Sequence, residues 1–280
     1  MSATFEAWLG RTEHVTDTVT ARQARQMAAT LGAEGLPLSD GDPLPPLWHR
    51  MGWLPEIPMA GLGPDGHPAR GGFLPPIPLE RRMWAGGRLT FHTALRIGQP
   101  MARRSEILKV SEKTGTTGRM VFVTVGHHTH GPDGLAVTEE QDIVYVAMPD
   151  QFSPPPPITA LEGAVWADPV AMDTVRLFRF SALTFNAHRI HFDLPYAMGV
   201  EQYPGLVVHG PMQAMLLMQA ARDHNGGAWP ARFRFRGVRP LFHFDSLRLM
   251  GWPIDDRAQP LATVIDGNVT CMQADIGWAA

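Results

Sequence analysis

The stretch GPMQAMLLMQAARDHNGG, residues 210–227, decides the fold. Pro211 opens the segment at a position where a missing N–H costs no helical hydrogen bond, and Gly226 follows its end. This punctuation predicts a helix over about residues 212–223. The helix is apolar on nearly every face, so we expect it to be buried rather than to lie on the surface.

Segments typical of strands lie on both sides of this helix. Runs of apolar, β-branched and aromatic residues between turn residues predict strands over residues 89–97, 105–110, 120–125, 142–148, 175–180, 231–238, 246–252, 261–266 and 269–276. Hairpin turns are predicted at residues 114–118 and 131–134, and a second helix, with Thr20 as its N-cap, at residues 21–31. The sequence therefore predicts an α+β fold, a double hotdog of two antiparallel sheets that each wrap around a central helix.

Four consecutive prolines, Pro154–Pro157, predict a stiff extended connector between two units. A length of 280 residues fits two packed units better than one. We expect an N-terminal hotdog over residues 1–150 and a C-terminal hotdog over residues 158–280.

An irregular segment, residues 43–80, is rich in proline, glycine and tryptophan. Long irregular segments in compact domains often form lids or binding loops. Within it, residues 61–66 match the spacing G-x-G-x-x-G, but Pro64 lies inside the motif and no strand pattern precedes it. A dinucleotide site is therefore not expected here.

The composition argues against several classes of protein. A formal net charge of −3 does not suit a nucleic-acid-binding protein. The single cysteine, Cys271, excludes a disulfide within the chain and a multi-cysteine zinc site, and we expect neither a metal nor a cofactor. The first residues contain no apolar run behind basic residues, and the longest apolar stretch is too short to span a bilayer. We therefore expect a cytoplasmic protein that does not enter the membrane.

Two neighbouring segments carry residues suited to catalysis. The stretch FSALTFNAHRIHFD, residues 180–193, holds His188 and His191, whose side chains titrate near neutral pH. The second segment, Tyr203–Pro211, leads into the buried helix. A helix N-terminus offers unpaired N–H groups and the positive end of a dipole, which together suit a developing oxyanion.

These segments resemble the active-site loop and helix entrance of MaoC-like (R)-specific enoyl-CoA hydratases and hydroxyacyl-thioester dehydratases. That superfamily has the pattern Ser–x–x–x–Gly–Asp–x–Asn–Pro–(Ile/Leu/Val)–His. Its final His falls on His191, its Asn on His188 and its catalytic Asp on Asn186. Nearly the whole chain, including RRMWAGG at residues 81–87, is similar to one double-hotdog branch, and the similarity is weak over residues 1–40. This branch contains 3-methylfumaryl-CoA (mesaconyl-C4-CoA) hydratases and FAS1-like hydroxyacyl-thioester dehydratases.

The resemblance implies a hydro-lyase that acts on a CoA thioester. Water would add to the β-carbon of a dicarboxylic enoyl-CoA, most simply 3-methylfumaryl-CoA, to give citramalyl-CoA. His191 is then the candidate base, and the N–H of Gly210 the candidate oxyanion donor. An amide does not titrate, so Asn186 would hold the water or fix a histidine tautomer. Either His188 supplies the second acid/base group, or His191 alone carries the proton.

Four further residues are expected to bind the substrate. An acyl group with a free carboxylate needs a cation, and Arg189 lies within the loop, although it could instead face solvent. Alternation in RFRFR, residues 232–236, places its arginines on one strand face, where Arg234 could hold the CoA phosphates or simply be solvated. The other two expected substrate-binding residues, Tyr203 and His209, come from the segment before the helix.

Three alternative functions remain open. The first is an (R)-3-hydroxyacyl dehydratase that acts on chains carried by CoA or acyl carrier protein. The second is a thioesterase, which the amide at Asn186 disfavours and the nearby Asp193 keeps possible. The third is a non-catalytic acyl-CoA binder. In each case we expect the N-terminal half to shape the acyl pocket, and the chain to form a homodimer.

Overall fold

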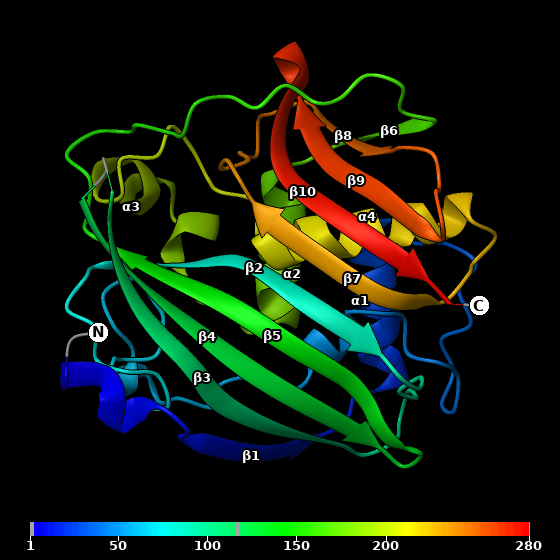
Figure 1. Ribbon diagram of the computed structural model, residues 1–280, viewed down its shortest axis with the longest axis horizontal. Helices are drawn as coiled ribbons and strands as arrows, with labels where there is room; N and C mark the ends of the chain where they lie inside the picture. Colours follow the sequence, from blue (N-terminus) through cyan, green and yellow to red (C-terminus); the bar gives the residue numbers. More distant parts are fainter. Residues whose placement is uncertain (1–2, 116–117, 280) are drawn as a thin grey trace.

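The computed structural model describes residues 3–115 and 118–279. Their ten strands form a single curved antiparallel sheet. The strand order is β1-β3-β4-β5-β2-β7-β10-β9-β8-β6, and every pair of neighbours is antiparallel (Figure 1). The strands are β1 (Thr12–Asp17), β2 (Arg81–Phe91), β3 (Met101–Gly115), β4 (Gly118–Gly131), β5 (Gly134–Val146), β6 (Trp166–Val170), β7 (Pro230–Gly237), β8 (Leu247–Gly251), β9 (Ala258–Ile265) and β10 (Val269–Trp278).

The two predicted sheets are joined edge to edge. β2 pairs with β7, with Gly86 opposite Arg236 and Thr90 opposite Arg232, so β1–β5 and β6–β10 form one continuous surface. The helices are α1 (Ala21–Leu31), α2 (Thr174–Leu183), α3 (Leu194–Gly199) and α4 (Gly210–His224), and the 3-10 helices are η1 (Ala3–Trp8), η2 (Trp48–Met51), η3 (Met59–Gly61), η4 (Arg189–His191) and η5 (Asp266–Asn268).

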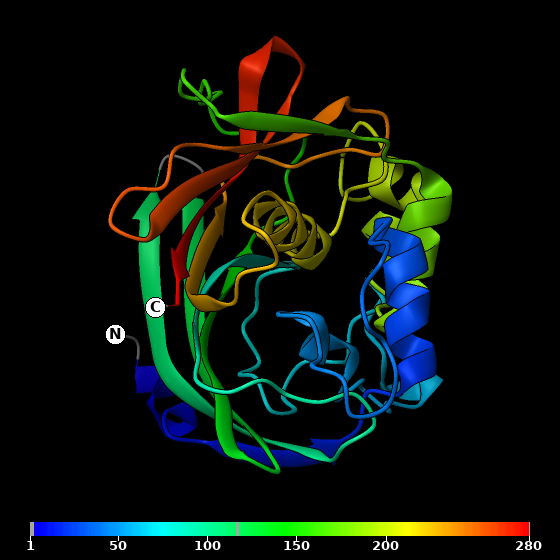
Figure 2. The same cartoon turned by 90° about the vertical axis from the view of Figure 1, so that its right-hand side faces the viewer.

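The predicted central helix is confirmed as α4. It lies in the hollow of the curved sheet and packs against β8, β9 and β10 (Figure 2). In the N-terminal half the corresponding hollow holds η2, whose Trp48 and Met51 are fully buried. The predicted helix at residues 21–31 is confirmed as α1, with Thr20 in a capping box, and it packs against α2.

Most predicted strands are confirmed, although the real strands are longer or shifted by several residues. The strand predicted over residues 175–180 is wrong, because these residues lie in α2. Asp173 caps this helix by accepting from the N–H of Arg176, and the buried Leu177 and Phe180 follow helical spacing. β1, β6 and α3 were not predicted. The turn predicted at residues 114–118 lies partly outside the described residues, whereas the turn at residues 131–134 is confirmed.

The prolines Pro155–Pro157 are exposed and lie outside any helix or strand, between β5 and β6. That residues 1–150 and 158–280 are separate domains stays a prediction. Among the described residues, no helix is both long enough and apolar enough to span a membrane.

The join between the two halves generates a stability prediction. A Cβ on Gly86 would lie 2.6 Å from the carbonyl oxygen of Phe235 in β7. Gly86→Ala should therefore force β2 and β7 apart and lower the free energy of unfolding by about 1–3 kcal/mol. Urea denaturation measures this change. The control is Gly237→Ala, where the new Cβ would meet its nearest atom at 3.8 Å. Equal stability of the two variants would contradict the prediction.

Candidate active site

The predicted catalytic loop runs from the end of α2 through η4. The Oδ1 atom of Asn186 accepts a hydrogen bond of 3.0 Å from the backbone N–H of His188. This bond folds the loop back on itself, and both His188 and His191 become buried. Asn186 therefore shapes the loop that presents the two histidines.

His191 is held in one tautomer. Its Nδ1 atom lies 2.7 Å from the carbonyl oxygen of Val207, which only accepts, so Nδ1 carries the proton and Nε2 keeps its lone pair. The ring stacks on that of His209, with ring centres 3.7 Å apart. Burial, together with the neighbouring His209 and His188, holds the pKa of His191 well below its ordinary value. His191 is therefore a neutral imidazole with a free lone pair, the form that a general base requires.

His188 is backed by a carboxylate. Its Nε2 atom lies 3.3 Å from Oε1 of Glu201, a residue that is only 3% exposed. Glu201 also accepts from Nε of Arg81 at 3.1 Å, and Arg81 donates to the hydroxyl of Tyr203. Tyr203, expected to bind substrate, thus belongs to a buried network that orients His188.

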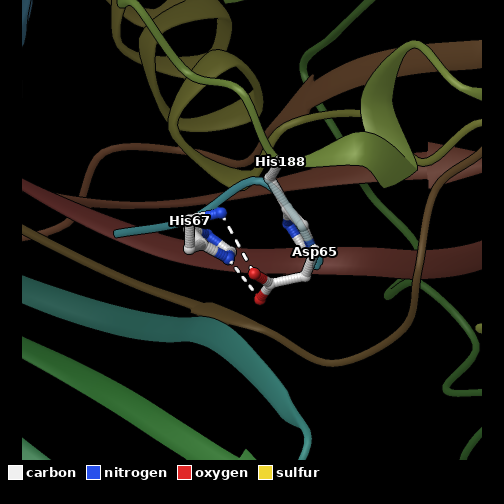
Figure 3. Close-up of side chains that lie close together, drawn as sticks. All are labelled: Asp65, His67 and His188. Atoms are coloured by element: carbon white, nitrogen blue, oxygen red, sulfur yellow. Dashed lines mark hydrogen bonds and ion pairs between the residues drawn. The ribbon is translucent and has the colours of Figure 1, made fainter. Parts of the chain in front are cut away.

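A second carboxylate–imidazole pair comes from the N-terminal half (Figure 3). In the irregular segment after η3, Oδ2 of Asp65 accepts from Nδ1 of His67 at 2.8 Å. Burial raises the pKa of Asp65, but the contacts with His67 outweigh it and lower this pKa to about 2. Burial lowers the pKa of His67 to about 3, although the bond to Asp65 opposes this shift. The His67 ring lies against that of His188, with centres 4.0 Å apart.

Four imidazoles thus follow one another from His67 through His188 and His191 to His209, and we call them the imidazole row. The ring of His188 meets that of His191 edge to face at 5.3 Å. The far end of the row, His209, is bonded through Nε2 to Oγ of Ser181 at 2.8 Å. Burial lowers the pKa of His209 to about 3. Asp65 and Glu201 both lie at the opposite end of the row.

The segment that carries Asp65 docks directly onto the catalytic loop. The carbonyl of Asp65 accepts from the N–H of Arg189 at 2.9 Å, and Nη1 of Arg189 donates to the carbonyl of Pro64 at 3.1 Å. Gly66 approaches so closely that a Cβ would lie 1.8 Å from the carbonyl oxygen of Ala187. The segment predicted as a lid or binding loop therefore forms part of the site.

The helix entrance lies beside the imidazole row. Gly210 is the first residue of α4, where backbone N–H groups have no acceptor within the helix. The indole of Trp84 on β2 closes this end, because a Cβ on Gly210 would lie 2.8 Å from its ring. The predicted oxyanion donor is thus next to His209 in the chain and against the N-terminal half in space.

Two expected substrate-binding residues lie differently. Arg189 pairs with Asp193 at 2.7 Å and lies over the ring of Tyr196, so its guanidinium is already engaged. Arg234 is exposed on β7, whereas Phe233 and Phe235 on the opposite face are buried in the core. The predicted alternation is confirmed, and it places Arg234 on the face of the sheet that points away from α4.

The trio Asp65, His67 and His188 also has the spacing of metal ligands, with one ligand atom from each within 4.8 Å of the others. The Asp65 carboxylate is already hydrogen-bonded by His67, and the positive charge of Arg82 acts on the same histidine. Such a setting favours proton transfer over cation binding. That the chain uses no metal and no cofactor stays a prediction.

The sequence could not have paired Asp65 with His188, because the two lie in different halves of the chain. The one available signal was an Asp-x-His pattern inside a segment already expected to be a lid or binding loop. Glu201 was missed for a related reason. It lies in the connection between α3 and α4, outside both segments that carried the resemblance.

Comparison with known proteins identifies the family of the chain. Residues 47–243 match the family described as hydroxyacyl-thioester dehydratase type 2. The chain is 48% identical over 282 residues to a mesaconyl-C(4)-CoA hydratase of Chloroflexus aurantiacus, with 98% of each chain covered. It is 26% identical over 235 residues to the mitochondrial hydroxyacyl-thioester dehydratase type 2 of Schizosaccharomyces pombe, which covers 74% of this chain and 77% of the relative.

Solved structures give the same fold. A MaoC-like dehydratase superposes with a TM-score of 0.74 at 12% identity, covering 98% of this chain and 100% of the other. A Mycobacterium tuberculosis protein described as a double hotdog gives a TM-score of 0.63 at 13% identity, with 96% of each chain covered.

The fold and the site define a double-hotdog protein of the MaoC-like hydratase and dehydratase type. The chain belongs to the hydroxyacyl-thioester dehydratase type 2 family. The predicted superfamily, fold class and hydro-lyase activity are therefore confirmed. The roles of individual site residues stay predictions.

The close approach at Gly66 can be tested directly. Gly66→Ala should lift the docked segment from the catalytic loop, because the new Cβ collides with backbone and the residue has a φ of +87°. Hydrogen exchange of residues 61–69, followed by mass spectrometry, should become at least about tenfold faster. In the control, Gly72→Ala, the new Cβ meets no atom within 4 Å. Unchanged exchange in Gly66→Ala would show that the segment is not held by this contact.

Buried neutral histidines make the stability depend on pH. In the unfolded chain His209 takes up a proton below its ordinary pKa of 6.5, whereas in the folded protein it does so only near pH 3. The unfolded state therefore binds more protons between these values, and stability falls as the pH drops below 6.5. His209 alone should account for about 2 kcal/mol of this loss at pH 5.

Urea denaturation at pH 7.5 and pH 5 measures the effect. The loss of unfolding free energy between the two pH values should be about 2 kcal/mol smaller in His209→Gln than in the parent. The comparison uses differences within each protein, so a lower overall stability of the variant does not affect it. An identical loss in both proteins would exclude a buried neutral His209.

Proposed function

We propose that this protein hydrates an α,β-unsaturated dicarboxylic acyl-CoA, and that 3-methylfumaryl-CoA is converted to citramalyl-CoA. The observation that carries the proposal is the neutral, single-tautomer His191 beside the N-terminus of α4. The choice of substrate draws on the 48% identity to a relative named mesaconyl-C(4)-CoA hydratase. That relative is matched over 98% of both chains, so both halves of this chain are included in the comparison.

In the proposed reaction the imidazole row transfers protons, and the helix entrance stabilises the negative charge that develops on the substrate. The Nε2 lone pair of His191 takes a proton from water, and the hydroxyl oxygen bonds to the β-carbon of the thioester. The electron pair of the double bond moves toward the thioester carbonyl, which becomes enolate-like. The N–H of Gly210 and the dipole of α4 stabilise this negative charge. Addition of a proton to the α-carbon completes the hydrated product.

The proton for the α-carbon has two possible sources. His188, backed by the Glu201 carboxylate, can hold a proton and deliver it as a general acid. Alternatively, His191 returns the proton that it took from water, which gives a syn addition. Asn186 takes no proton in either route, and its bond to the N–H of His188 keeps the loop in shape.

The remaining assignments follow from this reaction. The substrate is a CoA thioester, and the N-terminal half supplies one wall of the acyl pocket through Trp84. Arg234 faces away from the hollow that holds α4, so its part in binding CoA phosphates needs the CoA to pass over the edge of the sheet. A cytoplasmic location and a homodimer complete the proposal.

A second candidate is an (R)-3-hydroxyacyl-thioester dehydratase. The specific support is the match of residues 47–243 to the hydroxyacyl-thioester dehydratase type 2 family and the 26% identity to the Schizosaccharomyces pombe member. The chemistry would be the reverse reaction with the same residues. The two candidates differ in the acyl group and in the direction of the reaction, and the choice of acyl group separates them in an assay.

The first test is an assay with four thioesters: 3-methylfumaryl-CoA, itaconyl-CoA, crotonyl-CoA and a longer enoyl-CoA. We expect gain of one water, detected by mass spectrometry, on 3-methylfumaryl-CoA. His191→Ala should lower kcat by roughly 1,000-fold, because the base is lost. Prior treatment with a metal chelator should leave the rate of the parent protein unchanged.

Each other outcome points to a different function. Hydration of crotonyl-CoA or the longer ester alone would favour the dehydratase of fatty-acyl chains. Release of free CoA without hydration would indicate a thioesterase. Binding of all four esters without any reaction would leave a non-catalytic acyl-CoA binder.

A further inference from the structure

One arginine on β2 faces the active site without a carboxylate partner. Neighbouring strands pair Arg82 with Tyr145 and Trp84 with Ile143, so Arg82 and Trp84 lie on the same face of β2. Trp84 reaches the first residue of α4, as described above. Arg82 therefore lies on the inner wall of the sheet, two residues before the tryptophan that lies against the helix entrance.

The surroundings of Arg82 come from two different segments, the irregular segment before β2 and strand β5. Its positive charge acts on His67 and contributes to the low pKa of that histidine. On the other side lies the hydroxyl of Tyr145, whose pKa burial raises while Arg82 and Arg70 oppose the rise. Arg70 itself donates to the carbonyls of residues 77 and 80. Arg82 thus lies on the inner face of β2 and is close enough to His67, at one end of the imidazole row, for its charge to act on that ring.

Other arginines near the site already have partners: the carbonyls named above hold Arg70, and carboxylates hold three more. Arg81 pairs with Glu201 and Arg189 pairs with Asp193, while Arg50 pairs with Glu139. Within residues 3–115 and 118–279, no carboxylate forms an ion pair with Arg82. A half-buried guanidinium that has no ion-pair partner among the described residues is suited to receive an anion from a ligand.

We propose that Arg82 binds the free carboxylate of the acyl group and so determines the preference for a dicarboxylic substrate. This inference rests on the proposed function. In 3-methylfumaryl-CoA the free carboxylate is attached to the β-carbon, the atom that water attacks. A cation that holds it must therefore lie beside the imidazole row and beside the oxyanion donor. Arg82 meets both conditions, because its neighbours are His67 and Trp84.

The assignment replaces the one suggested by the sequence. Arg189 was expected to hold the carboxylate because it lies within the catalytic loop. Its guanidinium instead closes onto Asp193 and onto the carbonyl of Pro64. Arg189 therefore holds the docked segment in place, and the cation for the substrate comes from the opposite half of the chain.

The test compares two substrates in three variants. In Arg82→Gln, kcat/KM for 3-methylfumaryl-CoA should fall by roughly 100-fold, because a buried charge pair with the substrate is lost. The value for crotonyl-CoA, which has no free carboxylate, should stay within about threefold. Arg82→Lys keeps the charge but not the planar fork, so it should retain an intermediate preference. The matched control is Arg88→Gln on the same strand. Arg88 is bound to Glu140 and Asp142, so this variant should leave kcat/KM for both substrates unchanged.

The outcomes separate this inference from the proposed function. If the parent hydrates 3-methylfumaryl-CoA and Arg82→Gln does so equally well, the role of Arg82 is wrong and the function stands. Thermal unfolding first shows that Arg82→Gln and Arg82→Lys are folded. If kcat/KM then falls equally for both substrates in both variants, Arg82 is structural and the inference is again wrong. If the parent hydrates only esters without a free carboxylate, both the proposed substrate and the role of Arg82 are overturned.

Discussion

The pairing of β2 with β7 is the constraint on which the active site depends. Hydrogen bonds between the two strands fix their register, and with it the position of Trp84 over the first residue of α4. The catalytic loop and the helix entrance belong to the C-terminal half, whereas the opposite wall and the Asp65–His67 pair belong to the N-terminal half. The site therefore lies between the halves, and neither half contains it alone.

The electrostatics of the imidazole row assign different roles to the same type of side chain. Burial opposes positive charge on His67, His191 and His209, so most of the row stays neutral. The two carboxylates, Asp65 and Glu201, lie only at the end formed by His67 and His188. His67 and His188 therefore lie beside carboxylates, whereas His191 is bonded to the carbonyl of Val207 through Nδ1 and keeps the lone pair on Nε2.

The elements that could be predicted from sequence have strong local signals. α1 has a capping box and a glycine at its end, and α4 has an early proline and an apolar surface on nearly every side. The strand prediction over residues 175–180 was wrong because the apolar residues there fit both a strand and a helix period. Only the N-cap at Asp173 distinguishes the helix from a strand. The Asp65–His67 pair could not be predicted as part of the site, because contacts such as Arg189 to Pro64 join residues 125 positions apart.

The amide at Asn186 can be explained by the same division of the site. In the resembling superfamily this position holds a catalytic Asp, yet here the carboxylates come from Asp65 and Glu201, on the His67 and His188 side of the row. A carboxylate at position 186 would add a negative charge to the loop that carries His191. For a substrate with a free carboxylate beside the reacting carbon, that charge would be repulsive. Under the proposed function, the amide at position 186 and the unpaired Arg82 on the opposite wall act in the same direction, because neither adds negative charge near the free carboxylate of the acyl group.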